Sequence, residues 1–164
     1  MEWIFIEGSH VRAHQYSAGI ANQAISKSVG GNSSKIHLIF DAHGHPIDFM
    51  ITDGTTHDAK IAPELISKLE LTETDMVCAD KGYDSEPLRE QIRQTGTKAN
   101  IPKKSNIQSN NDHMEWYLYK IRHLVENTFC RLKQFRGIAI RYDKLKRNYE
   151  SSVALACIFL WLSL

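Results

Sequence analysis

The sequence has few cysteines, almost no net charge and no long hydrophobic run, and each absence excludes a class of protein. Its 164 residues include three scattered cysteines with no CxxC pair, which is typical of a reduced, cytoplasmic chain. The C-terminal apolar run, residues 153–164, is too short to span a bilayer and predicts a buried core helix that includes Trp161. We find no secretory signal, internal repeat or extended low-complexity segment.

The net charge of +1 does not indicate a nucleic-acid partner, but the distribution of charge does. Residues 131–147 are strongly basic and contain a single acid, Asp143, so the rest of the chain is acidic. A local basic block suits a phosphate backbone, and a solvated helix end followed by a loop is an equally weighted alternative. The basic residues are Arg131, Lys133, Arg136, Arg141, Lys144, Lys146 and Arg147.

The order of apolar and polar segments predicts an α/β fold. Short apolar runs bounded by turn residues predict strands, and longer amphipathic segments predict helices. The predicted strands cover residues 3–6, 36–40, 47–52, 76–79, 99–101 and 138–142, and the second and third form a hairpin. The predicted helices cover residues 59–70, 84–94, 115–135 and 147–162, with a polar loop at 102–112. This alternation predicts one domain with a mixed sheet flanked by helices.

The predicted helix 115–135 has one chemically distinctive face. At about 100° per residue, Tyr119, Arg122, Glu126 and Lys133 fall on one side, and the aliphatic residues fall on the other. A carboxylate that holds a metal, beside cations that hold phosphate, is what phosphodiester chemistry needs. An ordinary surface ion pair between Arg122 and Glu126 is the alternative interpretation.

Two further acids, Glu7 and Asp80, each follow a predicted apolar strand. Sites in sheets of this type lie at the carboxyl ends of strands. We therefore expect Glu7, Asp80 and Glu126 to converge, although Asp80 could instead cap the turn that follows it.

The histidines offer a weaker alternative site. His43 and His45, or His10 and His14, have spacings that zinc can use, but no cysteine or third ligand lies at a zinc-like spacing. His57 is a candidate donor behind the acids, with a core or cap role equally open. The aromatic candidates for base stacking are Trp116 and Tyr117.

Six segments in this order resemble the catalytic domain of bacterial insertion-sequence DDE transposases. They are residues 7–15, 35–37, 56–58, 79–85, 122–126 and 141–144, and the quartet of the long helix keeps the family's spacing around its last acid. The resemblance implies a ribonuclease-H-like fold, and it covers nearly the whole chain, residues 1–164.

The resemblance also implies the chemistry, which is strand cleavage at the element's ends followed by strand transfer to target DNA. The acids Glu7, Asp80 and Glu126 would bind two Mg²⁺ ions, for which Mn²⁺ can substitute, with Asp80 as the bridging ligand. The residues expected to contact DNA are Tyr119, Arg122 and Lys133, together with Arg141, Lys144, Lys146 and Arg147 of the basic block. The expected partners are the terminal inverted repeats and target DNA, bound by a homo-oligomer, with no membrane; the expected location is the cytoplasm, at the nucleoid.

The chain departs from the family pattern in two ways. The family has Asp where this chain has Glu7, and the extra methylene moves the carboxylate by about 1 Å or more, which a magnesium shell with oxygens at about 2.0–2.1 Å tolerates badly. Full-length relatives carry a helical DNA-binding module before the first catalytic strand. We therefore expect the second frame of a split-frame element, which acts with an upstream-frame polypeptide or as a fusion, or a decayed remnant.

Two other functions compete with an active transposase domain. One is a catalytically inactive DNA-binding or subunit-interaction fragment of a transposase. The other is a ribonuclease-H-like nuclease unrelated to transposition, which the matched segments around Glu126 disfavour.

Overall fold

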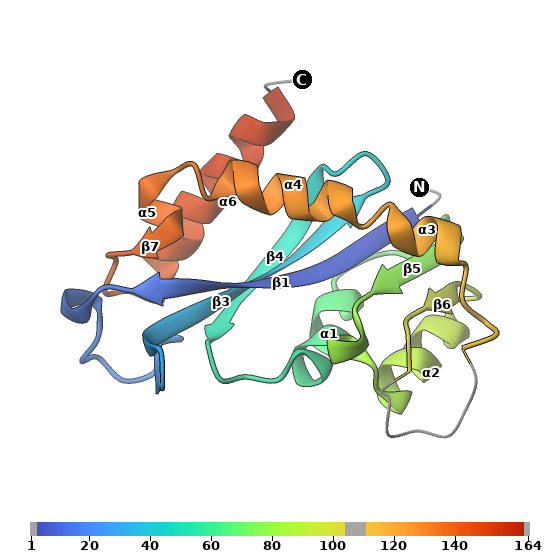
Figure 1. The fold of residues 1–164 in the computed structure, drawn as a ribbon, viewed down its shortest axis with the longest axis horizontal. Helices are drawn as coiled ribbons and strands as arrows, with labels where there is room; N and C mark the ends of the chain where they lie inside the picture. The colour runs from blue at the N-terminus through green and yellow to red at the C-terminus, as the bar shows by residue number, and fades with distance from the viewer. Residues whose placement is uncertain (1–2, 104–110, 163–164) are drawn as a thin grey trace.

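The computed structural model describes residues 3–103 and 111–162, and across them one mixed sheet runs through the molecule (Figure 1). The strand order is β2-β3-β1-β5-β6, with β4 paired to β3 and β7 paired to β1. β3 is antiparallel to β1 and β4, whereas β5 and β7 are parallel to β1. The strands are β1 Trp3–Ala13, β2 Ser26–Ser28, β3 Gly31–Asp41, β4 Pro46–Asp53, β5 Met76–Ala79, β6 Lys98–Asn100 and β7 Ile140–Arg141.

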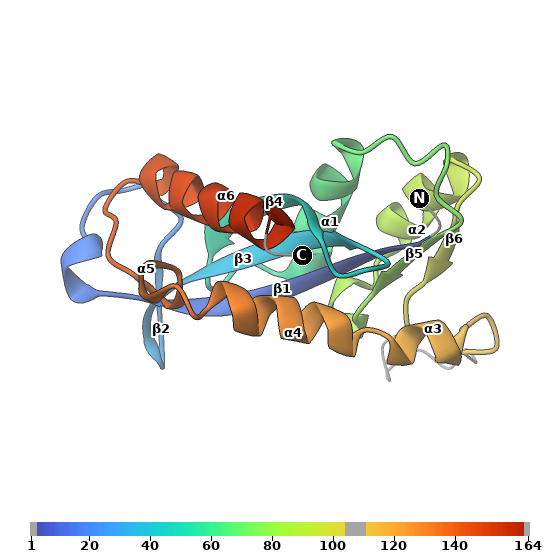
Figure 2. The same cartoon turned by 90° about the horizontal axis from the view of Figure 1, so that it is seen from above.

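Helices cover both faces of the sheet, with α4 and α6 on one face and α1 and α2 on the other (Figures 1 and 2). The helices are α1 Asp58–Ser67, α2 Glu86–Gln94, α3 Trp116–Lys120, α4 His123–Leu132, α5 Arg136–Ala139 and α6 Lys146–Leu162. Two 3₁₀ turns follow strands: η1 Gln15–Ser17 comes after β1, and η2 Lys81–Tyr83 comes after β5.

The pleat of β1 decides which of its side chains meet which core. Ile4 and Ile6 pack with α1 and α2, while Phe5 and Val11 pack with α4 and α6. Because side chains alternate along a strand, Glu7 shares the face of Phe5 and points toward α4. The predicted α/β class and the 36–52 hairpin are confirmed.

The predicted single helix over 115–135 is wrong, because the structure divides it. The Ile121 N–H donates to the Leu118 carbonyl and the Leu124 N–H donates to the Ile121 carbonyl, which is the tighter i→i+3 pattern. This turn separates α3 from α4 and places Arg122 at the start of α4. The predicted extended segment at 138–142 is also partly helical, since Ile138 lies buried within α5.

The C-terminal run forms a helix that buries only one face. Tyr149, Val153 and Leu160 enter the core, but the Trp161 side chain is 49% exposed, so the prediction of a core role for it is wrong. Its indole N–H donates to the Pro46 carbonyl, and its ring stacks on an imidazole of the β3–β4 turn. No helix within the described residues has the length and apolar character needed to cross a membrane. Most of the predicted loop at 102–112 lies outside the described residues.

Candidate active site

Glu7 sits in the middle of β1 with its carboxyl group largely sheltered, since its side chain is 18% exposed. Burial raises the pKa of Glu7 above its ordinary value, although Arg122 and the Gly8 backbone N–H oppose that rise. Within the described chain, Oε2 of Glu7 is buried and accepts no hydrogen bond. A buried carboxylate oxygen that accepts no hydrogen bond is available to bind a cation or a hydrogen-bond donor from outside the chain.

Asp80 follows β5 directly, and the strand register brings it beside Glu7. β1 and β5 are parallel neighbours with Ile6 opposite Ala79, so the next residue of each strand is an acid. Burial works to raise the pKa of Asp80, but the Lys81 backbone N–H and Arg122 outweigh it, and the pKa is lowered. Asp80 is therefore ionised in conditions where Glu7 begins to hold its proton.

The guanidinium of Arg122 joins all three predicted acids. Its Nε lies 3.4 Å from Oε2 of Glu7, and its Nη1 lies 3.0 Å from Oδ1 of Asp80. Its Nη2 lies 3.7 Å from Oε1 of Glu126, one turn along the helix. Carboxyl groups separated by long stretches of sequence thus meet at one side chain. The contact with Glu126 is the loosest and most exposed, and contributes little to stability.

Tyr119 and Lys133 extend this polar surface in two directions. The Tyr119 hydroxyl donates to Oδ1 of Asp80 at 3.2 Å and accepts from Nη1 of Arg122 at 3.0 Å. The Lys133 ammonium donates to the Ser9 hydroxyl at 2.7 Å. Two of the acids, Glu7 and Glu126, and the cations Arg122 and Lys133 line a hollow of about 270 Å³, which we call the acid hollow. It is lined by Glu7, Gly8, Ser9, Arg122, Glu126, Phe129, Cys130 and Lys133.

The basic block does not act as one surface. Arg141 is fully buried and donates to the Asp143 and Ala24 carbonyls and to the Ser34 hydroxyl, so the prediction that it contacts phosphate is contradicted. Burial lowers the pKa of Arg141, and its guanidinium lies 5.1 Å from the ring centre of Tyr149. Lys144 and Arg147 are exposed, and Lys146 pairs with Glu150 at 3.4 Å.

A second polar group, which sequence reasoning missed, lies beneath the acids. Lys35 and Asp58 form an ion pair there. The imidazole of His37 shares hydrogen bonds with the Tyr83 hydroxyl at 3.0 Å and the Thr52 hydroxyl at 2.9 Å. Burial lowers the pKa of His37 to about 4, so it is neutral at physiological pH. The available signal was a lysine and a histidine inside an otherwise apolar strand.

Gly8 is the point where β1 meets this polar group. A Cβ on Gly8 would lie 2.7 Å from Cε of Lys35 and 2.8 Å from the Tyr83 oxygen, which real contacts do not allow. His57 is exposed at the start of α1 and makes no side-chain cap, so the prediction of a donor behind the acids fails for it. Its neighbour Asp58 occupies that place instead.

The carboxylates have the oxygen chemistry that Mg²⁺ and Mn²⁺ prefer, and Oε2 of Glu7 is buried and accepts no hydrogen bond. Oxygens that share one magnesium lie about 3 Å apart. Over residues 3–103 and 111–162, no group of three or more His, Cys, Asp or Glu side chains is gathered this closely. The Arg122 guanidinium lies among the three acids, so a shared cation requires that side chain to move.

A mixed sheet whose neighbouring strands present acids, with a further acid from a helix, is the arrangement expected of the DDE class of transposases. The chain matches the family described as "Transposase DDE domain" over residues 2–161, and it belongs to that family. It is therefore a DDE-type transposase catalytic domain of an insertion sequence, within a family of phosphoryl-transfer enzymes.

Relatives of known sequence point to insertion sequences in particular. The chain is 36% identical over 131 residues to a protein assigned as a transposase for element IS6501 of Brucella ovis, covering 79% of this chain and 98% of the other. It is 30% identical over 130 residues to the transposase for element IS1106 of Neisseria meningitidis, covering 76% and 44%. The chain thus spans less than half of that second relative.

The piggyBac transposase, a solved structure, supports the ribonuclease-H-like fold. The piggyBac transposase in a synaptic complex with hairpin DNA aligns with a TM-score of 0.56 and 11% identity, covering 96% of this chain and 46% of that one. The Mos1 mariner paired-end complex with Mn aligns with a TM-score of 0.42 and 11% identity, covering 94% and 55%.

Proposed function

We propose that this domain cleaves and transfers DNA strands at the ends of an insertion sequence, with Glu7, Asp80 and Glu126 as its metal-binding acids. The convergence of these carboxyl groups on one guanidinium is the observation that carries the proposal. Both strand cleavage and strand transfer are displacements at phosphorus. The substrate is DNA that carries the terminal repeats, together with target DNA.

The acids would hold Mg²⁺ or Mn²⁺, which activates the attacking oxygen and stabilises the leaving oxygen of the displacement. Asp80, which directly follows β5, would hold the cation together with Glu7, its neighbour across the parallel pair of β1 and β5. Arg122 pairs with all three acids. With a cation held by the acids, Arg122 would be free to donate to a backbone phosphate in bidentate fashion, alongside Lys133.

Glu7 is the weak point of this arrangement. Its carboxyl group is buried, its pKa is raised, and its side chain is one methylene longer than the family's Asp. When a metal-binding side chain is displaced by about 1 Å, the rate of the catalysed reaction falls strongly. We therefore expect weak nicking by the chain as it stands and stronger nicking by Glu7→Asp.

The experiment compares metal-dependent nicking of DNA carrying the element's ends by the wild type, Glu7→Asp, and Asp80→Asn. Thermal unfolding with and without Mn²⁺ gives a second measurement that does not depend on activity, because a cation that binds only the folded form raises the melting temperature. We expect Glu7→Asp to increase both nicking and the Mn²⁺-induced shift. If Glu7→Asp changes neither while Asp80→Asn abolishes both, Glu7 is not a compromised ligand.

Arg122→Gln tests the proposed exchange between arginine and metal. Removing the guanidinium should strengthen Mn²⁺ binding, seen as a larger thermal shift, while nicking falls because a phosphate contact is lost. A smaller thermal shift would contradict the exchange.

A catalytically inactive DNA-binding fragment is the second candidate, favoured by the lengthened acid and by the guanidinium among the carboxylates. Neutralising Lys144, Lys146 and Arg147 together should then weaken binding to the same extent for all DNA sequences and flatten its salt dependence. Binding of this kind without nicking, even after Glu7→Asp, would favour the inactive fragment.

A further inference from the structure

Three aromatic rings stack at the end of β1 that is remote from β5. The imidazole of His14 lies 5.1 Å from the ring of Tyr16, tilted by 33°, and 5.1 Å from the ring of Tyr142, tilted by 30°. Tyr16 belongs to η1, and Tyr142 follows β7, which pairs with the end of β1. The tyrosine side chains are 72% and 52% exposed, so each offers ring surface to solvent.

The fold of this corner does not depend on the exposed rings. The His14 N–H donates to the Arg141 carbonyl at 2.8 Å, and the Ser17 N–H and hydroxyl both donate to the His14 carbonyl. The guanidinium of Arg141 fixes the chain beneath, through the Ala24 carbonyl and the Ser34 hydroxyl. Backbone hydrogen bonds already hold η1 and β7 together, so the two exposed tyrosine rings, which lie beside one imidazole, are available to contact a partner.

The residues near the three rings in the sequence are mostly basic, which favours a negatively charged partner. Exposed Arg12, Lys144 and Arg147 lie within a few residues of the rings along the chain, and Asp143 is the single acid in residues 141–147. Aromatic rings next to mobile cations are the pattern that binds single-stranded nucleic acid, because bases stack on the rings while the cations contact phosphates. A base within an intact duplex is already stacked on both faces and has no free face to offer.

The ring cluster lies beyond the far end of the strand that carries Glu7. β1 ends at Ala13, directly before His14, and the seven residues from Glu7 to His14 span about 23 Å of extended chain. A DNA strand that leaves the acid hollow and follows β1 would reach the rings. Lys133, which reaches Ser9 of β1, lies along the way.

We propose that His14, Tyr16 and Tyr142 form a stacking site for an unpaired base of the DNA strand that extends from the cleavage position. This inference rests on the proposed DNA substrate and deepens it, because it states which part of that substrate is single-stranded. Either tyrosine can offer a ring face to the base, and the imidazole of His14 contacts both rings.

The test uses two short DNAs of the element's end, one a blunt duplex and one with a single-stranded extension that carries 2-aminopurine. We expect the wild type to bind the extended DNA more tightly and to quench the 2-aminopurine fluorescence. The double variant Tyr16→Ala/Tyr142→Ala should lose this extra affinity, on the order of tenfold, with blunt-duplex binding unchanged. The double Phe variant, which keeps both rings, should behave as the wild type.

Phe159→Ala is the matched control, since Phe159 is an aromatic residue that is 55% exposed on α6 and lies outside the stack. Equal loss of affinity for blunt and extended DNA would reduce the corner to a charged surface and overturn the stacking site. The stacking site would also be overturned if the wild type bound both DNAs equally or did not quench the fluorescence. The same holds if the double Phe variant lost the extra affinity although its thermal unfolding was normal. A wild type that binds neither DNA would instead overturn the proposed function itself.

Discussion

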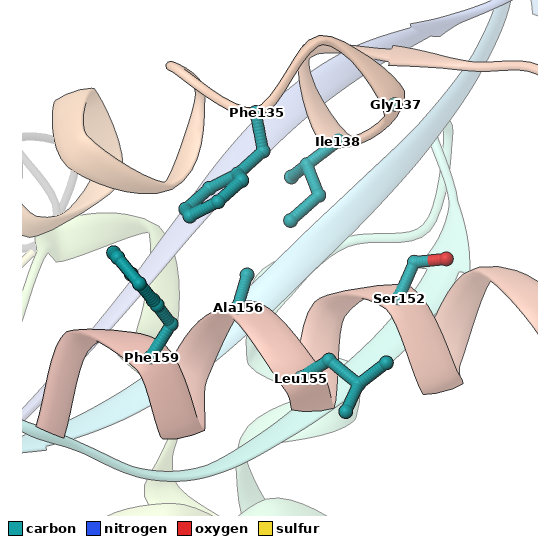
Figure 3. A pocket seen from close by; sticks show the side chains of 7 residues that line it. All are labelled: Phe135, Gly137, Ile138, Ser152, Leu155, Ala156 and Phe159. Carbon is teal, nitrogen blue, oxygen red and sulfur yellow. The ribbon is translucent and has the colours of Figure 1, made fainter. Parts of the chain in front are cut away.

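Two of the hollows on the surface differ in size and chemistry, and the proposed active site lies at the smaller one. The acid hollow measures about 270 Å³. A larger hollow of about 370 Å³ lies between α5 and α6, where the rings of Phe135 and Phe159 meet edge to face at 5.6 Å (Figure 3). We call it the apolar hollow. It is lined by Phe135, Gly137, Ile138, Ser152, Leu155, Ala156 and Phe159.

The apolar hollow contains a single polar side chain, the Ser152 hydroxyl, and nothing that ionises. The acid hollow, only a few residues away along the chain, contains two carboxylates and two cations. The difference arises because the end of α4 faces the polar part of β1 on one side, while α5 faces the aliphatic part of α6 on the other. Ionisable groups held by rigid elements, rather than volume, identify the site.

The largest expected effect separates the acids around Arg122, of which Asp80 lies beside the acid hollow, from the apolar hollow by activity. Asp80→Asn keeps the shape of the side chain but removes a metal-binding charge, so nicking should fall by more than the roughly 10- to 100-fold that loss of a supporting residue costs. Phe159→Ala, in the apolar hollow, should leave nicking within about twofold. Initial rates on DNA with the element's ends measure both. If Asp80→Asn and Phe159→Ala reduced nicking by similar factors, the acids would not be more important for activity than the apolar hollow.

A smaller effect concerns DNA affinity. Lys133→Ala removes one cation from the acid hollow, and we expect binding to weaken roughly three- to tenfold, with the slope of log affinity against log salt reduced by about one. Ser152→Ala is the matched truncation in the apolar hollow and should change neither quantity. Fluorescence anisotropy at several salt concentrations gives both values. An unchanged slope for Lys133→Ala would mean that this ammonium does not contact phosphate.

The smallest effect is a pH dependence of stability. Because burial raises the pKa of Glu7, its contribution to stability is fully present below the ordinary value of 4.5 and is lost as pH rises through the folded-state pKa. Glu7→Gln cannot ionise, so it should gain stability relative to the wild type as pH rises above 4.5. Chemical unfolding with EDTA present, at pH 4 and pH 7, measures the difference.

Phe159→Leu is the control for that measurement, because no titrating side chain lines its hollow, and its difference from the wild type should not depend on pH. If the stability difference between Glu7→Gln and the wild type were also the same at pH 4 and pH 7, burial would not raise the pKa of Glu7.

Local patterns predicted much of this molecule, and contacts distant in sequence account for the rest. The hairpin of β3 and β4 followed from two apolar runs around a turn. The prediction that Glu7 follows a strand is wrong, because β1 continues to Ala13, and Glu7 and Asp80 are neighbours through the register of β1 and β5. Charge along the chain could not distinguish Arg141 from Lys144, because the acceptors that bury Arg141 come from Ala24 and Ser34. The role of Asp58 was missed for the same reason, since its partner Lys35 belongs to another element.

The guanidinium shared by Glu7, Asp80 and Glu126 has a consequence for folding. Three negative side chains are brought together with a positive side chain of the same polypeptide among them, so their packing does not depend on a cation from solution. Under the proposed function, a divalent cation would therefore bind a chain that has already folded.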